Sequence, residues 1–259
     1  MKFINETAGD KMTSFCVKLA EIVIEIHALY PTTRKFFKDY LTDGNPLFSV
    51  YVSREDLDYE QEQSDLLSSM ENGKPIHHTG PYLETLAIHR KIAEEMLNYD
   101  VLLFHGSAVA VDGWAYLFTA PSGTGKSTHA RLWREFFGSR AVMINDDKPF
   151  LKCTEKGIIA YGTPWNGKHH LGTNTAAPLK AVCILTRDAE NYIERISVRD
   201  ALLTLYIQGY HSEEPSRMEK TLVLIGRISR YTALYRLGCN MEPEAAKISY
   251  EGMQEMAEK

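Results

Sequence analysis

The spacing of apolar residues in the first part of the chain favours β-strands. Residues 13–29 hold two adjoining runs of β-forming side chains, and residues 47–52 alternate between apolar and polar again. The segment 55–65 is acidic and is expected to be solvated. These patterns predict a small β-rich N-terminal lobe over residues 1–80.

The pattern changes to a helical period after residue 80, and the rest of the chain mixes both periods. Residues 81–99 have the apolar spacing of an amphipathic helix. The apolar runs 107–111 and 114–118 are joined by Asp112-Gly113, a strong β-hairpin signal. Further strands are expected at 101–104, 141–144, 150–153, 158–161, 181–186 and 234–237, and further helices at 126–137, 198–206, 219–228 and from Pro243 towards Met256. We predict an α/β protein with α+β character, whose second domain spans residues 81–259.

Composition indicates a globular protein of one large or two small domains. The chain has 259 residues, of which 44% are hydrophobic and 24% charged. Its net charge of −5 gives no reason to expect nucleic-acid binding. No apolar run approaches the roughly 20 residues of a membrane span, and the first residues lack a signal-peptide core. The four cysteines are far apart, which favours free thiols. We expect a cytoplasmic protein without nucleic-acid or membrane partners.

A turn of small residues joins the strand predicted at 114–118 to the helix predicted at 126–137. Strand, loop and helix in this order are the context of a phosphate-binding P-loop, in which backbone N–H groups and the helix N-terminus hold phosphate oxygens. Lys126 can reach the terminal phosphates, and Ser127 can ligate Mg²⁺. The candidate nucleotide-binding residues are Ser122, Gly123, Thr124, Gly125, Lys126, Ser127 and Thr128. The alternative is a structural turn, since Ala120 stands where the common pattern has its first glycine.

Two adjacent carboxylates, Asp146 and Asp147, close the strand predicted at 141–144. In P-loop enzymes an aspartate at a strand end holds Mg²⁺, and a second carboxylate can accept the proton of an attacking hydroxyl. Successive strand residues point to opposite faces, so one aspartate cannot duplicate the other. The alternative is a turn or a helix cap, where paired aspartates are common.

Other polar residues add candidates. His105 follows a strand expected beside the P-loop strand; it either contacts an aspartate or a phosphate, or is structural. The loop 162–168 has glycines for close backbone approach, and Lys168 can neutralise phosphate charge; the alternative is an ordinary surface loop. The pairs His77-His78 and His169-His170 lack the spacing of a helical zinc site, which disfavours a metal there.

Three segments together resemble one family group. Phe104-His105-Gly106-Ser107-Ala108, Ser122-Gly123-Thr124-Gly125-Lys126-Ser127 and Ile144-Asn145-Asp146-Asp147 look like the core of the C-terminal domain of bacterial HPr kinase/phosphorylase. They are also similar to ATP-dependent phosphoenolpyruvate carboxykinase. The resemblance covers about residues 100–185 and implies a P-loop domain with a mixed sheet. It further implies that Asp146 is the base, that Asp147 ligates the metal and that His105 lies in the active site.

The chain also departs from that family. Thr128 stands where HPr kinase usually has a glutamate, its substrate-binding arginine loop is not found, and the N-terminal lobe does not match. The resemblance therefore supports phosphoryl transfer but not HPr as the substrate.

We expect an ATP- and Mg²⁺-dependent kinase that phosphorylates a hydroxyl of an unidentified protein, peptide or small molecule. The catalytic candidates are Asp146, His105, Lys126 and Lys168, and the metal ligands are Ser127 and Asp147. The alternatives are a nucleotide-gated binding module without turnover and a carboxykinase-type lyase. Related kinases form homo-oligomers, but no residue pattern in this chain fixes a subunit count.

Overall fold

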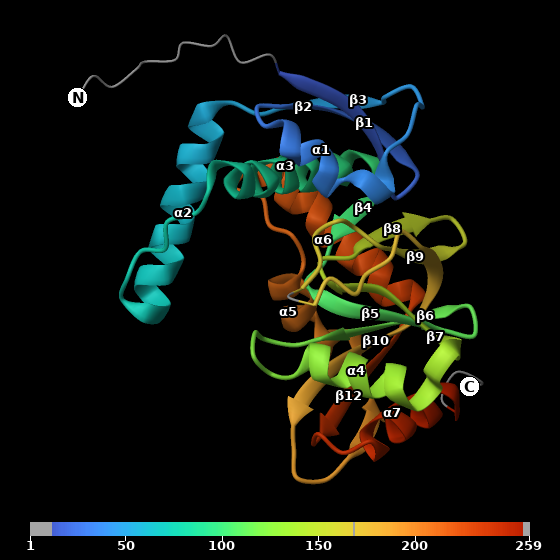
Figure 1. Ribbon diagram of the computed structural model, residues 1–259. Coiled ribbons are helices and arrows are strands. Elements are labelled where there is room, and N and C mark those ends of the chain that lie inside the picture. Colours follow the sequence, from blue (N-terminus) through green and yellow to red (C-terminus); the bar gives the residue numbers. More distant parts are fainter. Residues whose placement is uncertain (1–11, 168, 256–259) are drawn as a thin grey trace, which may run out of the picture. The chain divides into compact units, whose positions relative to one another are not determined.

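The computed structural model describes residues 12–167 and 169–255 (Figure 1). The chain divides into two compact units between Ile92 and Ala93. This division falls inside helix α3 (Gly80–Met96), which contributes residues to both units. The boundary expected from the sequence, between residues 80 and 81, lies at the start of the same helix.

The first unit contains a three-stranded sheet. Its strands are β1 (Thr13–Leu19), β2 (Ile22–Ala28) and β3 (Phe48–Tyr51), and they confirm the three strands predicted for this region. Strand β2 lies in the middle, antiparallel to β1 and parallel to β3. Ala20 and Glu21 have positive φ and form the two-residue turn between β1 and β2.

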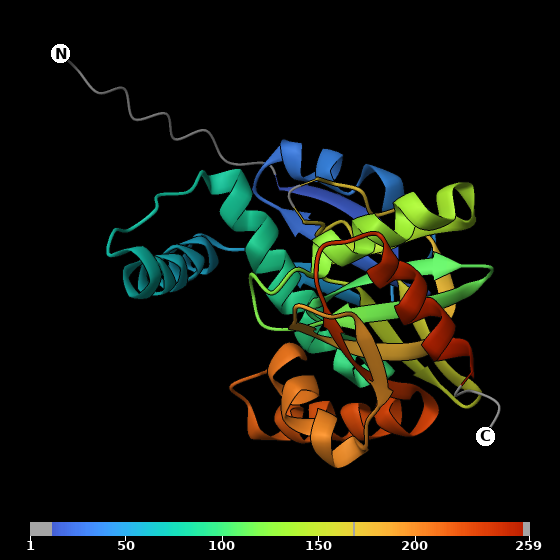
Figure 2. The ribbon, with the colours of Figure 1, turned by 90° about the horizontal axis from the view of Figure 1, so that it is seen from below.

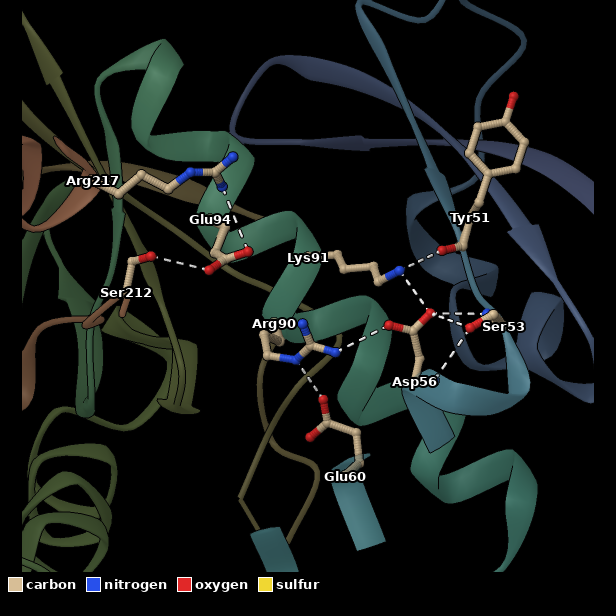
Figure 3. A network of polar contacts seen from close by, with 9 residues as sticks. All are labelled: Tyr51, Ser53, Asp56, Glu60, Arg90, Lys91, Glu94, Ser212 and Arg217. Atoms are coloured by element: carbon tan, nitrogen blue, oxygen red, sulfur yellow. Dashed lines mark hydrogen bonds and ion pairs between the residues drawn. The ribbon is translucent and has the colours of Figure 1, made fainter. Parts of the chain in front are cut away.

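The acidic segment 55–65 lies in helix α2 (Arg54–Asn72), which the sequence analysis did not predict. Ser53 and Asp56 form a capping box at its N-terminus. The Asp56 carboxylate also accepts a hydrogen bond of 2.7 Å from Lys91, and Glu60 accepts one of 2.7 Å from Arg90 (Figure 3). Both cations belong to α3, so the acidic face of α2 is held by charge rather than by the apolar stripe that periodicity detects.

A buried carboxylate on α3 supports the short helix α1 (Pro31–Phe36). This helix has no side-chain cap at Tyr30. The fully buried Glu84 accepts hydrogen bonds from the backbone N–H groups of Leu29 and Tyr30 and from the hydroxyl of Thr33. A residue distant in the sequence thus stabilises the start of α1.

The second unit is built on a mixed sheet. Its strands are β4 (Val101–Leu103), β5 (Gly106–Val111), β6 (Trp114–Thr119), β7 (Ala141–Asp147), β8 (Phe150–Thr154), β9 (Gly157–Tyr161), β10 (Ala176–Arg187), β11 (Tyr192–Arg195) and β12 (Ala233–Cys239). The order is β4-β8-β9-β10-β6-β5-β7, and β12 joins β10 to β11. Strand β10 is parallel to β6 and β12, and the other pairs are antiparallel. The expectation of an α/β protein with a mixed sheet is confirmed.

Helices cover both faces of this sheet (Figure 2). They are α4 (Lys126–Phe137), α5 (Val198–Gln208), α6 (Pro215–Tyr231) and α7 (Glu244–Glu255). Helices α4 and α7 share one buried core with one face of the sheet, and α5 and α6 share the other core with the opposite face. The predicted helices and the β5–β6 hairpin are confirmed, whereas the short and mostly exposed strand β11 was not predicted.

Two further properties bear on the sequence-based expectations. All four cysteines are free, with Cys153 and Cys183 buried. Within the described ranges, the helices are too short or too polar to cross a membrane.

A buried polar cluster joins α4 to α7. The Ser249 hydroxyl donates to the carbonyl of Ala246, so its oxygen accepts from Trp133 Nε1 at 2.8 Å and from His129 Nε2 at 3.1 Å. His129 therefore carries its proton on Nε2, and its Nδ1 has no hydrogen-bond partner among the described residues. Burial lowers the pKa of His129 to about 3, so the folded protein keeps this ring neutral.

We expect His129 to make the fold less stable in acid. The unfolded ring takes up a proton near the ordinary histidine pKa of 6.5, whereas the folded ring does so only near about 3. Stability from this residue is therefore complete above 6.5 and falls as the pH drops towards 3. The variant His129→Gln keeps an N–H donor but does not titrate. Its free energy of unfolding, measured in urea across this pH range, should fall less steeply than that of the wild type, by up to about 1.4 kcal/mol per pH unit. Identical slopes would contradict this assignment.

Candidate active site

The loop between β6 and α4, residues 120–125, is here named the glycine loop. Gly123 has a φ of 76° and Gly125 a φ of 127°, in a region that side chains rarely adopt. A Cβ at either position would meet nothing within 4 Å, so backbone conformation rather than crowding requires glycine. Gly125 is the N-cap of α4, and among the described residues no side chain caps this helix. Its first N–H groups are thus available to an anion.

Lys126 lies against the glycine loop. Its Nζ donates to the carbonyl oxygens of Ala120 at 2.8 Å and Pro121 at 3.3 Å. Burial lowers the pKa of this lysine; the charges of Asp147 and Asp146 act to raise it, and the charge of Lys148 acts to lower it. The charges of both β7 carboxylates therefore act on the ammonium group while it remains attached to the loop.

Arg187 is a residue of this region that the sequence analysis missed. It ends β10, which runs parallel to β6 and pairs Ile184 with Thr119 at the base of the glycine loop. Its guanidinium donates to the carbonyl oxygens of Gly123 and Thr124. A cation at the end of a strand is a weak signal, and the sequence did not indicate that β10 neighbours β6.

A β-bulge in β7 decides the directions of the two aspartates. Val109 of β5 pairs with Met143, but the next residue, Ala108, pairs with Asn145, so Ile144 is the extra residue. Met143 belongs to the core beneath α4, and Ile144 belongs to the opposite core. The extra residue shifts the alternation by one, so that Asp146 lies on the α4 face like Met143.

Asp146 is 6% exposed and is oriented by a neighbour in the sheet. The Ser107 hydroxyl donates to Asp146 Oδ1 at 2.7 Å, from the residue that pairs with Asp146 across the sheet. A Cβ on Gly167 would stand 2.7 Å from the Asp146 carbonyl oxygen, so this loop reaches the strand only as glycine. Ser107 lies in one of the three segments that resemble HPr kinase/phosphorylase, but the sequence alone assigned it no role.

Asp147 lies beside His105. His105 Nε2 is 3.4 Å from Asp147 Oδ1, and Lys148 Nζ is 4.0 Å from the same oxygen. Burial, together with the charges of Lys148 and Lys126, lowers the pKa of His105 to about 4. The imidazole is therefore neutral near pH 7 and contacts Asp147 as a dipole rather than as a cation.

The buried side chain of Asn145 connects β7 to the loop that follows β9. Its Oδ1 accepts from the backbone N–H groups of Asp147 at 2.8 Å and Lys148 at 2.6 Å. Its Nδ2 donates to Thr163 Oγ1 at 3.0 Å and lies 3.3 Å from the carbonyl oxygen of Trp165. Asn145 also lies in one of the segments that resemble HPr kinase/phosphorylase, but only its hydrogen bonds in the fold reveal that it holds this region together.

A pocket of about 380 Å³ opens on the α4 face. Its walls include Ser127 and Thr128 from the first turn of α4, Asp146 from β7, and His169. Ser127 and Asp146 thus share one pocket, whereas Asp147 contacts His105. Lys168, a candidate from the sequence, lies outside the described residues.

The residues present can be compared with the needs of Mg²⁺. This ion prefers oxygen ligands and usually binds one or two carboxylates together with substrate phosphates and water. Ser127 supplies an exposed hydroxyl, and the side chain of Asp147 is 37% exposed. No group of three or more His, Cys, Asp or Glu side chains able to hold a metal occurs in the described part of the chain. These oxygen donors are of the kind that Mg²⁺ binds, and an ion here would need phosphate oxygens and water to complete its coordination.

Comparison with known proteins gives distant likenesses among solved structures. Neither the protein-family models nor the curated proteins produce a match. Among solved structures, the chain is similar to the HPr(Ser) kinase/phosphatase of Coxiella burnetii, with 10% identity, a TM-score of 0.34, and coverage of 60% of this chain and 98% of that chain. Values this low do not place the chain in a family, so the chemistry of the site rests on its own residues.

Asn145→Leu is expected to lower the free energy of unfolding by about 3 kcal/mol, because two backbone N–H groups and the Thr163 oxygens would lose a buried partner. Urea unfolding measures the effect. The exposed Asn98, replaced in the same way, is the control and should change stability by no more than about 0.5 kcal/mol. Equal effects at the two positions would show that the Asn145 contacts do not hold this region together.

Proposed function

We propose that this protein is an ATP- and Mg²⁺-dependent kinase that transfers the γ-phosphoryl group of ATP to a hydroxyl group. One observation carries the proposal. Asp146, oriented by Ser107, lines the same pocket as Ser127 and Thr128, which lie in the first turn of the helix that follows the glycine loop. A candidate base and a candidate phosphate-binding site therefore border one space.

The glycine loop and Lys126 are the proposed phosphate-binding elements. The N-terminus of α4, which has no side-chain cap, and the positive-φ backbone of Gly123 and Gly125 suit the β- and γ-phosphates of ATP. Lys126 is already attached to the loop through Ala120 and Pro121, so it needs only to exchange carbonyl partners for phosphate oxygens. Magnesium, held by Ser127 and Asp147, would reduce the negative charge on the phosphates.

Asp146 is the proposed base. Ser107 occupies its Oδ1, which leaves Oδ2 to accept the proton of the acceptor hydroxyl. The hydroxyl oxygen forms a bond to the γ-phosphorus as the bond from that phosphorus to the bridging oxygen breaks, and the electron pair leaves with ADP. Neutral His105 supports Asp147 by contact, and Lys168 keeps the charge-neutralising role assigned from the sequence.

The base assignment predicts that Asp146→Asn lowers phosphoryl transfer by about 100-fold or more and leaves the affinity for ATP within about twofold. Transfer is measured with γ-labelled ATP and a panel of hydroxyl compounds, with water as the background acceptor. The exposed Asp188 gives the matched control, Asp188→Asn, which should remain active. An active Asp146→Asn variant would remove Asp146 from the mechanism, and ATP binding without any turnover in the wild type would favour a nucleotide-gated binding module.

The phosphate-binding assignment predicts saturable binding of ATP that depends on Mg²⁺ and weakens at least about tenfold in Lys126→Ala, since a charged hydrogen bond to phosphate is lost. Calorimetric titration of ATP and ADP, each with and without Mg²⁺, measures this. Lys156→Ala, in an exposed hairpin, serves as the control and should bind like the wild type. If the wild type binds neither nucleotide, the glycine loop is a structural turn and the kinase proposal fails.

A further inference from the structure

One face of α4 carries a charge that the proposed reaction does not use. Ser127, Arg131 and Arg134 are spaced by four and three residues and line the same pocket as Asp146. The two arginines lie about 6 and 10 Å beyond Ser127 along the helix axis. The pocket therefore extends from the proposed transfer site towards two cations.

Arg134 has no side-chain partner among the residues that the structure describes. Its side chain is half-buried, and among the described residues it makes no ion pair and no side-chain hydrogen bond. Other arginines of the chain are paired, for example Arg90 with Glu60 and Arg140 with Asp112. Arg131 contacts Glu135 at 2.7 Å, but both of these side chains are more than half exposed, and such pairs are weak.

The charge in the pocket is unbalanced. Asp146 is the one carboxylate among the described residues that line it, and Ser107 already donates to one of its oxygens. Two guanidinium groups line the pocket together with this single carboxylate, and Glu135, the partner of Arg131, is not among the lining residues. A guanidinium presents its N–H groups in a planar fork that matches a carboxylate or a phosphate, so a bound anion would supply what the pocket lacks.

We propose that Arg134, assisted by Arg131, binds an anionic group of the phosphoryl acceptor, so that the substrate is a small hydroxyl compound with a carboxylate or a phosphate. This inference rests on the proposed function. The hydroxyl lies at Asp146, and the anion lies further along α4. A pocket of about 380 Å³ is at the lower end of the range for small-molecule sites.

Three compounds with one carbon skeleton test the proposal: glycerol, glycerate and glycerol 3-phosphate. Each is titrated calorimetrically into the whole 259-residue chain, without nucleotide and again with saturating ADP. Glycerate, glycerol 3-phosphate or both should bind at least about tenfold more tightly than glycerol. Preference for one of the two anions identifies the carboxylate or the phosphate as the recognised group. Equal binding of all three compounds, or binding of none, overturns the proposal.

Three variants and one control locate the anion. Arg134→Gln should weaken anion binding at least about tenfold, and Arg134→Lys should restore part of it. Lys126→Ala should retain anion binding without nucleotide, which separates the pocket from the glycine loop. The exposed Arg230, changed to Gln, is the matched control and should leave anion binding unaltered. A thermal unfolding curve for each variant identifies any that are misfolded.

The results separate this proposal from the kinase proposal. If Arg134→Gln instead weakens ATP binding and Lys126→Ala abolishes anion binding, the arginine belongs to the nucleotide site and the acceptor assignment is wrong. If anions bind through Arg134 but ATP does not bind at all, the kinase proposal fails while the anion site stands.

Discussion

The end of β7 depends on the buried amide of Asn145. Its oxygen holds the backbone of the next two residues, and its nitrogen holds the loop that contains Thr163 and Trp165. A carboxylate in its place could accept hydrogen bonds but not donate them, and an apolar side chain could neither accept nor donate them. The amide therefore fixes the backbone of Asp147 and the loop that leads to Gly167.

Local signals in the sequence were sufficient for the framework of the site. The Asp112-Gly113 turn predicted the hairpin that leads into the glycine loop, and the apolar spacing of residues 126–137 predicted α4. Both predictions depend only on residues that are close together in the sequence. The roles of Ser107 and Arg187 depend on strand register and on β10 lying beside β6, and neither is written in local periodicity.

Polar contacts account for most of what the sequence analysis missed. Periodicity counts apolar positions, so it found the strands of the first unit but not α2, whose partners are Arg90 and Lys91 on another helix. Glu84 looked like an ordinary helical glutamate, yet it is fully buried against the start of α1. In each case the stabilising partner is distant in the sequence but adjacent in the fold, a relation that only the packing reveals.

The extra residue, Ile144, decides on which face of the sheet each later residue of β7 lies. Side chains on a strand have only two possible faces, so a shift of one position exchanges them completely. If β7 kept all its residues but paired regularly, without the bulge, Asp146 would lie on the α5 and α6 side and Asp147 on the α4 side. A substitution that keeps the bulge does not produce that exchange, because it changes the identity of a side chain and not the face on which the side chain lies. The spacing of residues in this strand, as much as their identity, therefore specifies which carboxylate meets the pocket.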